Sequence, residues 1–282
     1  MPFTTLISPS ALAKCSGESN TIVIDCRFKL DAPAWGEDIF REAHIPGAVY
    51  AHLDRDLSGA KTGTNGRHPL PDIGAFAATL GRLGVSNRSQ VVAYDQDSGI
   101  YASRLWWMLR WAGHDAVAVL DGGFGAWLAE NRPTERGPAP ATPAVFTAAP
   151  RPELLVDLAG VARIASTRAA LLLDARAPQR FRGETESLDR VAGHIPTARN
   201  YFFQQNVDER GVFKSAEDLR TQLTASLGTK RPEQVVCYCG SGVTACHNLL
   251  ALEHAGLTGA RLYAGSWSEW CADDDRAVAT GD

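Results

Sequence analysis

The sequence predicts two α/β domains, each a mostly parallel β-sheet with helices on both faces. Three observations lead to this fold class: a length that suits two domains, an internal repeat, and short β-branched runs that alternate with helical patterns. The chain has 282 residues, whereas a globular domain typically takes about 150. Strands that alternate with helices are typical of a parallel sheet covered on both faces. We therefore expect a ligand site at the carboxyl ends of the strands, where loops lead into helices.

Four sequence matches recur in the same order in the two halves of the chain. One match could arise by chance, but four in one order at a nearly constant separation indicate duplication. The pairs are IVIDCR (22–27) with LLLDAR (171–176), His-Ile-Pro at 44–46 and 194–196, VVAYD (91–95) with VVCYC (235–239), and LDGGFGAW (120–127) with LYAGSWSEW (262–270).

The predicted elements follow this repeat. Buried strands are expected in each half at TIVIDCR, VVAYD and AVAVLDGG, and at ALLLDAR, QVVCYC and ARLYAG. Apolar residues at a 4-3-4 spacing predict a helix after the second strand of each set. These residues are Tyr101, Leu105, Met108 and Ala112 in the first half, and Ala245, Leu249, Leu252 and Gly256 in the second.

A proline-rich stretch separates the two halves. Six prolines fall between residues 131 and 152, a composition typical of an extended, semi-rigid linker. We place the domains at 1–135 and 151–282, with the linker at 136–150.

Composition excludes several classes of protein. Lys and Arg total 28 and Asp and Glu total 32, a net charge of −4. Such a chain has no overall attraction for nucleic acid or for an anionic membrane, and we expect neither as a partner. No apolar run reaches the roughly 18 residues of a membrane span, and the first cation, Lys14, comes too late for a secretory signal. Six cysteines are too few for a disulfide scaffold, so we expect cytoplasmic thiols.

The loop CGSGVTA after the second-half VVCY strand carries the clearest chemical signal. Cys239 ends the predicted strand, and Gly240 and Gly242 let the backbone curl so that its amides point inward. Inward amides at a helix N-terminus form an anion cradle, here residues 240–244 including Ser241, Val243 and Thr244, which stabilises a thiolate. Cys239 is therefore the predicted nucleophile. A buried structural cysteine is the alternative, but it would leave the glycine curl without a purpose.

With this loop, LDGGFGAW and the terminal GSWSEW, the chain resembles the tandem-domain rhodanese-type sulfurtransferases, and among them the 3-mercaptopyruvate sulfurtransferases. In that family the second domain carries the catalytic cysteine and the first has lost it. Asp95 stands at the first-half position that matches Cys239, in agreement with the family. The resemblance implies that Cys239 takes sulfur from a donor as a persulfide and passes it to a thiophilic acceptor, without metal or organic cofactor.

The resemblance also implies a donor. Thiosulfate-using relatives have a basic pair in the loop, where this chain has neutral Gly-Ser-Gly. This difference favours the monocarboxylate 3-mercaptopyruvate, with thiosulfate as the alternative. Two family arginines that bind the donor carboxylate correspond to Arg180 and Arg190, and Arg182 competes with Arg190 because of a one-residue register difference. The acceptor is left open among cyanide, thioredoxin, glutathione and other small thiols.

A proton relay is the last implication of the resemblance. The family's Ser-His-Asp set corresponds to Ser241 in the loop and to His68 and Asp54 in the first half. A serine hydroxyl oriented by histidine could protonate the enolate that leaves as the S–C bond breaks. This relay would explain why a first domain without the catalytic cysteine is retained.

Other interpretations of the cysteine loop are less favourable. A metal site of Cys237, Cys239, Cys246 and His247 is disfavoured because the strand and helix would keep these side chains from converging. A cysteine phosphatase would need an arginine where Ala245 stands. A non-enzymatic persulfide carrier or redox module stays open. The repeated His44 and His194, and the repeated Asp-x-Arg pairs, are interpreted as structural because the first half, which lacks the catalytic cysteine, keeps them too.

Overall fold

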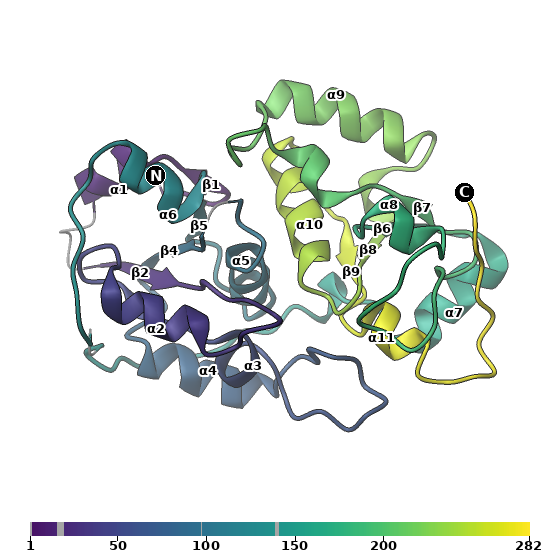
Figure 1. Ribbon diagram of the computed structural model, residues 1–282, viewed down its shortest axis with the longest axis horizontal. Helices are drawn as coiled ribbons and strands as arrows, with labels where there is room; N and C mark the ends of the chain where they lie inside the picture. Colours follow the sequence, from purple (N-terminus) through teal and green to yellow (C-terminus); the bar gives the residue numbers. More distant parts are fainter. Residues whose placement is uncertain (1, 16–19, 97, 139–140) are drawn as a thin grey trace. The chain divides into compact units, whose positions relative to one another are not determined.

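The computed structural model contains two parallel β-sheets, each in a separate unit of the chain (Figure 1). It describes residues 2–15, 20–96, 98–138 and 141–282. The main division between the units falls between Arg151 and Pro152, and two short segments are grouped with the other unit. The first unit comprises Met1–Gly59, Pro71–Arg151 and Glu209–Phe213, and the second comprises Ala60–Leu70, Pro152–Asp208 and Lys214–Asp282.

The first sheet has the strand order β1-β5-β4-β2-β3, with every pair parallel. Its central strands read as continuous apolar runs because helices cover both faces. The register places Ile24 beside Ala93 on one side and Val49 on the other. The strands are β1 (Leu6–Ile7), β2 (Thr21–Asp25), β3 (Val49–Tyr50), β4 (Gln90–Tyr94) and β5 (Val117–Leu120).

The second sheet repeats this topology in the order β7-β6-β8-β9. A parallel bridge between Leu155 and Leu262 takes the place that β1 has in the first sheet. The predicted fold class is confirmed, and the sequence repeat has its counterpart in the strand order. The strands are β6 (Leu171–Asp174), β7 (Arg199–Asn200), β8 (Val235–Tyr238) and β9 (Arg261–Leu262).

Helices cover both faces of each sheet. In the first unit α1 (Pro9–Cys15), α2 (Trp35–Glu42) and α6 (Gly123–Ala129) pack on the face that presents Val23, Val92 and Ala118. Alternate residues point to the other face, where α5 (Ala102–Trp111) packs on β4 and β5. The helices α3 (Leu53–Asp56) and α4 (Ile73–Arg82) complete the unit.

The second unit repeats this arrangement. α7 (Leu158–Thr167) and α11 (Ser266–Trp270) pack on one face, and α10 (Thr244–His254) packs on the other with α9 (Ala216–Leu227) beside it. The single-turn helix α8 (Pro178–Phe181) follows β6. Three short 3-10 helices lie at Pro152–Leu154, Phe203–Asn206 and Pro232–Gln234.

The repeated histidines and Asp-x-Arg pairs have structural tasks. His44 and His194 are buried, stack on Phe40 and Phe181, and contact the carbonyl oxygens of those residues through Nδ1, at 2.7 and 2.8 Å. The Asp-x-Arg pairs form buried ion pairs at the ends of β2 and β6, with N–O distances of 2.6 and 2.7 Å. These contacts recur in the first unit, which has Asp95 at the position of Cys239, so they serve the fold.

The proline-rich stretch has no helix or strand over residues 141–150. It follows the first unit through main-chain hydrogen bonds from Ala144 to Gly81, from Ala149 to Ala112 and from Arg151 to Trp111. Residues 139 and 140 of the expected linker lie outside the described residues. Within the described part of the chain, no helix has both the length and the apolar character that crossing a membrane requires.

Candidate active site

The predicted nucleophile lies where β8 ends and α10 has not yet begun. Cys239 and Ser241 are buried, and the backbone N–H of Gly242 donates to the Cys239 Sγ atom at 3.2 Å. Gly242 has a φ of +76°, and a Cβ atom there would lie 2.4 Å from the carbonyl oxygen of Ala264. Only glycine fits this position, so the curl predicted from the sequence is present and brings an amide to the sulfur.

The first turn of α11 is hydrogen-bonded to the backbone of the nucleophile loop. The N–H groups of Trp267 and Ser268 donate to the carbonyl oxygens of Cys239 and Gly240, both at 2.9 Å. Ser266 adds a side-chain bond, because its Oγ atom accepts from the Cys239 N–H at 3.1 Å. The sequence repeat marked this segment but indicated no role for it. Its role is to fix the position of the nucleophile's backbone.

Ser266 has an unusual backbone conformation for a serine. Its φ is +56°, where the first unit has Gly123 at +58°. A side chain in this left-handed region costs roughly 1–2 kcal/mol. Ser266 Oγ accepts from Cys239 and also donates to the carbonyl oxygen of Tyr263 at 2.9 Å. These two buried hydrogen bonds offset the backbone cost.

The loop of the first unit that matches the cysteine loop binds a carboxylate. Asp95 is fully buried at the position that matches Cys239, and its backbone oxygen accepts from Phe124 as that of Cys239 accepts from Trp267. The Asp95 carboxylate accepts backbone N–H bonds from Gly99 at 2.9 Å, Tyr101 at 2.7 Å and Ala102 at 3.1 Å. The loop of the first unit therefore cradles an anion of its own chain. This contact supports the reading of residues 240–244 as an anion cradle, with Val243 buried and Thr244 beginning α10.

His68 meets Ser241 in the second unit. Its Nδ1 atom lies 2.7 Å from Ser241 Oγ, and both side chains are buried. The contact lies within the second unit, because the segment Ala60–Leu70 packs with that unit although it lies in the first half of the sequence. Asp54 lies on α3 of the first unit, so its part in the relay stays a prediction.

Arg180 lies beside the loop. It is the third residue of α8, and its Nη atoms lie 3.6 and 3.7 Å from the point that a Cβ atom on Gly240 would occupy. Its Nε and Nη2 atoms form a bidentate pair with Glu186, at 3.1 and 2.8 Å, and Nη2 also contacts Asp189 at 3.0 Å. The guanidinium is thus fixed in orientation by two carboxylates of the same unit.

Arg190 and Arg182 make other contacts. Arg190 is 54% exposed and pairs with Asp274 at 2.7 Å, with a further bond to the carbonyl oxygen of Ala272 at 3.3 Å. Arg182 pairs with Glu184 at 2.7 Å. Arg190 also lines a cavity of about 340 Å³ together with Arg67, Asp189 and Ser268. The choice between Arg190 and Arg182 as the second carboxylate partner stays a prediction.

Arg67 is a residue that the sequence reasoning missed. Its Nη2 atom would lie 2.9 Å from a Cβ atom on Gly240, and its Nη1 atom pairs with Asp189. Its backbone N–H donates to Ser268 Oγ at 2.9 Å, so the segment that carries Arg67 and His68 is bonded to the loop's support. The one available signal was adjacency to His68, which was itself assigned to the first half.

Burial and ion pairing have opposite effects on the pKa values of Asp189 and Glu186, the two carboxylates that contact Arg180. Burial raises the pKa of Asp189, and the nearby Arg67 offsets this effect only in part. Burial also opposes ionisation of Glu186, but hydrogen bonds from Arg180 and from two backbone amides hold its pKa below the ordinary value. The donor amides belong to Leu188 and Asp189, at 2.8 and 3.1 Å. Glu186 is therefore the firm anchor of Arg180.

The other cysteine-loop residues do not converge. The Cys246 Sγ atom donates to the carbonyl oxygen of Gly242 at 3.3 Å, and His247 Nδ1 contacts Asn206 at 3.1 Å. Burial raises the pKa of Cys237 well above the ordinary value. Among the described residues, no group of three or more His, Cys, Asp or Glu side chains could hold a metal ion.

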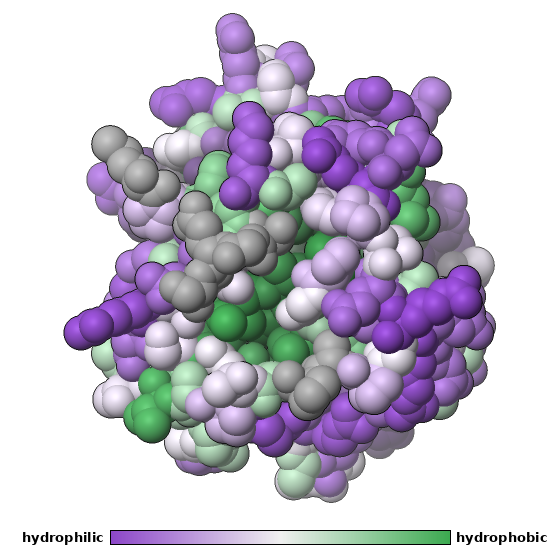
Figure 2. All heavy atoms as spheres, turned by 90° about the vertical axis from the view of Figure 1, so that its left-hand side faces the viewer, coloured by the Kyte–Doolittle hydropathy of each residue, from purple (hydrophilic) through white to green (hydrophobic). Residues whose placement is uncertain are grey.

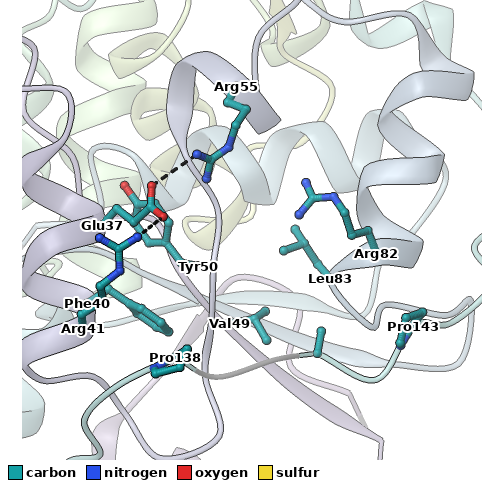
Figure 3. A pocket seen from close by; sticks show the side chains of 11 residues that line it. Glu37, Phe40, Arg41, Val49, Tyr50, Arg55, Arg82, Leu83, Pro138 and Pro143 are labelled. Carbon is teal, nitrogen blue, oxygen red and sulfur yellow. Dashed lines mark hydrogen bonds and ion pairs between the residues drawn. The ribbon is translucent and has the colours of Figure 1, made fainter.

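The first unit has a cavity of its own, of about 630 Å³. Figure 2 shows hydrophobic side chains gathered in a hollow. Figure 3 shows the cavity residues, among which Glu37 pairs with Arg41 at 2.7 Å and with Arg55 at 3.3 Å. Among the described residues that line it there is no cysteine.

Comparison with known proteins gives a consistent result. A family model described as "Rhodanese-like domain" matches residues 8–130 and 159–273. A Pseudomonas aeruginosa protein named "Probable 3-mercaptopyruvate sulfurtransferase" is 46% identical over 279 residues, which cover 98% of each chain. A thiosulfate sulfurtransferase of Gallus gallus is 37% identical over 235 residues, 82% of this chain and 79% of that protein.

Among solved structures, a 3-mercaptopyruvate sulfotransferase from Escherichia coli superposes with a TM-score of 0.80 at 32% identity. The match covers 95% of this chain and 100% of that one. Sequence and structure thus match along almost the whole length.

Proposed function

Because this chain belongs to the rhodanese-like domain family and carries that domain twice, we propose that it is a sulfurtransferase that moves sulfur from 3-mercaptopyruvate to a thiophilic acceptor. The observation that carries the proposal is the Cys239 sulfur at the glycine loop, with the buried His68–Ser241 pair in the same unit. A nucleophile, an anion cradle and a proton-transfer pair are the three parts that the reaction needs.

The first step forms a persulfide on Cys239. The thiolate attacks the sulfur atom of the donor, an S–S bond forms, and the S–C bond breaks with its electron pair left on carbon. The resulting enolate takes a proton from Ser241, which His68 resupplies, and leaves as pyruvate. The cradle amides, of which the Gly242 N–H already reaches the sulfur, stabilise the negative charge on sulfur.

The second step releases the sulfur. Cyanide or a thiol attacks the outer sulfur atom of the persulfide, the S–S bond breaks, and its electron pair restores the Cys239 thiolate. The acceptor is a small molecule or a protein thiol such as that of thioredoxin. A cytoplasmic location belongs to the same proposal, because the six cysteines of the chain are too few for a disulfide scaffold and a reducing compartment would maintain the Cys239 thiol.

Charge in the second unit favours a monoanionic donor. Three arginines, Arg67, Arg176 and Arg180, alternate with three carboxylates, Asp174, Glu186 and Asp189, in one connected set of ion pairs. These six charges balance. A monocarboxylate therefore adds one negative charge to the set, whereas the thiosulfate dianion adds two. Thiosulfate is the alternative donor, and the similarity to a thiosulfate sulfurtransferase supports it.

The test of this function is the persulfide itself. The protein is mixed with 3-mercaptopyruvate without an acceptor, and its intact mass and released pyruvate are measured. We expect a mass gain of one sulfur atom on Cys239, lost again when cyanide is added. Cys239→Ser should show no gain, and the matched variant Cys237→Ser, which changes a buried cysteine of β8, should gain the sulfur. Sulfur loading of Cys239→Ser would overturn the proposal.

A further inference from the structure

His52 occupies the N-cap position of α3, the short helix that carries Asp54. Its Nδ1 atom accepts the backbone N–H of Asp54 at 3.1 Å and that of Arg55 at 3.3 Å. The first N–H groups of a helix have no partner within the helix, and the side chain at the N-cap usually supplies one. Serine, threonine, aspartate and asparagine are the usual residues at this position, so a histidine here requires a further explanation.

The hydrogen bonds of the His52 ring fix its tautomer. The backbone N–H groups of Asp54 and Arg55 can only donate, so Nδ1 must present a lone pair. On the other side of the ring, Nε2 lies 3.2 Å from the carbonyl oxygen of Pro33, which can only accept. The ring is therefore neutral, with its hydrogen on Nε2. A ring turned over by 180° would lose all three hydrogen bonds. Unlike the usual N-cap residues, a histidine both caps the helix and donates to a neighbouring loop.

Aromatic packing and a second backbone contact hold the same helix. Phe28 meets the His52 ring edge-on, with centroids 5.1 Å apart and ring planes at 84°, and Tyr50 does so at 6.3 Å. Asp56 makes the arrangement reciprocal, because its Oδ2 atom accepts the His52 N–H at 2.8 Å. Asp56 is buried, and Arg82 pairs with its other oxygen atom at 2.6 Å. The helix is therefore held at its N-cap and at its last residue.

This support matters because α3 has only four residues. Helices of that length are not stable on their own in water, so contacts outside the helix determine where its residues lie. Asp54 corresponds to the relay aspartate that the resemblance implies. In a Ser-His-Asp set the carboxylate fixes the orientation and tautomer of the histidine, and a small displacement of such a group lowers the rate strongly. The position of the Asp54 backbone therefore bears on proton transfer.

We propose that His52 is a positioning residue for the proton relay. Its Nδ1 atom holds the backbone of Asp54, and its Nε2–H group hydrogen-bonds the helix to the loop at Pro33. His52 acts on the reaction through Asp54, and it is assigned no contact with the donor. This inference rests on the proposed function and on the relay role of Asp54.

A double-mutant cycle tests whether His52 acts through Asp54. The value of kcat for 3-mercaptopyruvate, with cyanide as acceptor, is measured for the wild type, His52→Ala, Asp54→Asn and the double variant. His52→Ala should lower kcat on the order of tenfold because Asp54 is displaced, and Asp54→Asn should lower it at least as much. In the Asp54→Asn background His52→Ala should change kcat by less than about twofold, since both substitutions affect one step.

Three further measurements separate positioning from stability. His52→Asn retains an acceptor at the N-cap and should keep kcat within about threefold of the wild type. Asp157→Ala removes the N-cap of α7, where Asp157 accepts from the Gly160 N–H at 2.8 Å, and should leave kcat unchanged although it also removes a cap. With thiosulfate, whose sulfite needs no proton, kcat of His52→Ala should stay within about twofold of the wild type. His52→Leu, which keeps apolar packing without a hydrogen-bonding atom, replaces His52→Ala if the alanine variant does not fold.

Additive losses in the double variant would show that His52 acts elsewhere and would overturn the proposal. A normal kcat in His52→Ala, or a kcat in His52→Asn as low as that in His52→Ala, would also overturn it. Failure of the proposed function would give a different result, because the wild type would then form no persulfide from 3-mercaptopyruvate. A wild type that forms the persulfide and an Asp54→Asn variant with normal kcat would refute the role of His52 and leave the function in place.

Discussion

The Nδ1 atom of His68 lies 2.7 Å from the Oγ atom of Ser241, although 173 positions separate the two residues in the sequence. Both side chains are buried, where a hydrogen bond is electrostatically stronger than in water. Since Ser241 is the second residue after Cys239, this pair can deliver a proton close to the reacting sulfur.

His68→Gln should separate the two donors. The enolate that leaves 3-mercaptopyruvate needs a proton, whereas the sulfite that leaves thiosulfate does not. We expect kcat for 3-mercaptopyruvate to fall about 100-fold, within the usual range for loss of a general acid, and kcat for thiosulfate to fall only a few-fold. Parallel steady-state assays with cyanide check this. Equal losses with both donors would show that His68 only supports the loop.

Gly242→Ala should displace the nucleophile loop. The new Cβ atom would lie 2.4 Å from the carbonyl oxygen of Ala264, at a φ of +76°. The control is Gly63→Ala, because Gly63 has a φ of +91° but no atom within 4 Å of its Cβ position. Both variants pay the backbone cost of about 1 kcal/mol, and only Gly242→Ala should lose more than about tenfold in kcat/KM. Similar kcat/KM values for the two variants would show that the loop tolerates a side chain.

Asp95→Ala should destabilise the first unit. The substitution removes the acceptor of three buried backbone N–H groups, and each unsatisfied donor costs on the order of 1 kcal/mol or more. We expect the free energy of unfolding, measured with urea, to fall by about 2–4 kcal/mol. Asp275→Ala, at an exposed position, is the control and should change it by less than about 0.5 kcal/mol. An unchanged free energy of unfolding in Asp95→Ala would contradict the interpretation of this loop as an anion cradle.

Asp189→Asn should raise KM for 3-mercaptopyruvate several-fold, because Arg180, the predicted donor-binding residue, loses its ion pair with Asp189. Its effect on stability should depend on pH. Burial raises the pKa of Asp189 in the folded protein, so the carboxyl contributes most stability below its unfolded pKa of about 4 and loses it as the pH rises through the folded pKa. The stability of the wild type relative to Asp189→Asn should therefore decrease between pH 3 and pH 6 in urea titrations. An opposite slope would show that ion pairing outweighs burial.

The sequence was sufficient to predict the fold because each signal for it is local. Strand and helix patterns extend over a few residues, and the repeat shows them twice. Asp25 therefore corresponds to Asp174, and Tyr94 to Tyr238, and this correspondence can be recognised from the sequence alone. The curl after Cys239 could be predicted for the same reason, because Gly240 and Gly242 follow this residue directly in the chain.

The rest of the site depends on distant contacts. Arg67 was missed because the segment that carries it lies in the first half of the sequence but belongs to the second unit. Arg190 pairs with Asp274 and Arg67 pairs with Asp189, and no sequence pattern indicates either partner. The hydrogen bond from the Cys239 N–H to Ser266 depends on the positive φ of Ser266, which cannot be predicted from a serine in the sequence.

The central claim is tested most directly by kcat/KM for 3-mercaptopyruvate and for thiosulfate, measured on one preparation with cyanide as the common acceptor. The balanced charges around Arg67 and Arg180 and the proton-transfer pair at Ser241 predict a strong preference for 3-mercaptopyruvate. A preference for thiosulfate would leave Cys239 as the nucleophile but contradict the assignment of the donor.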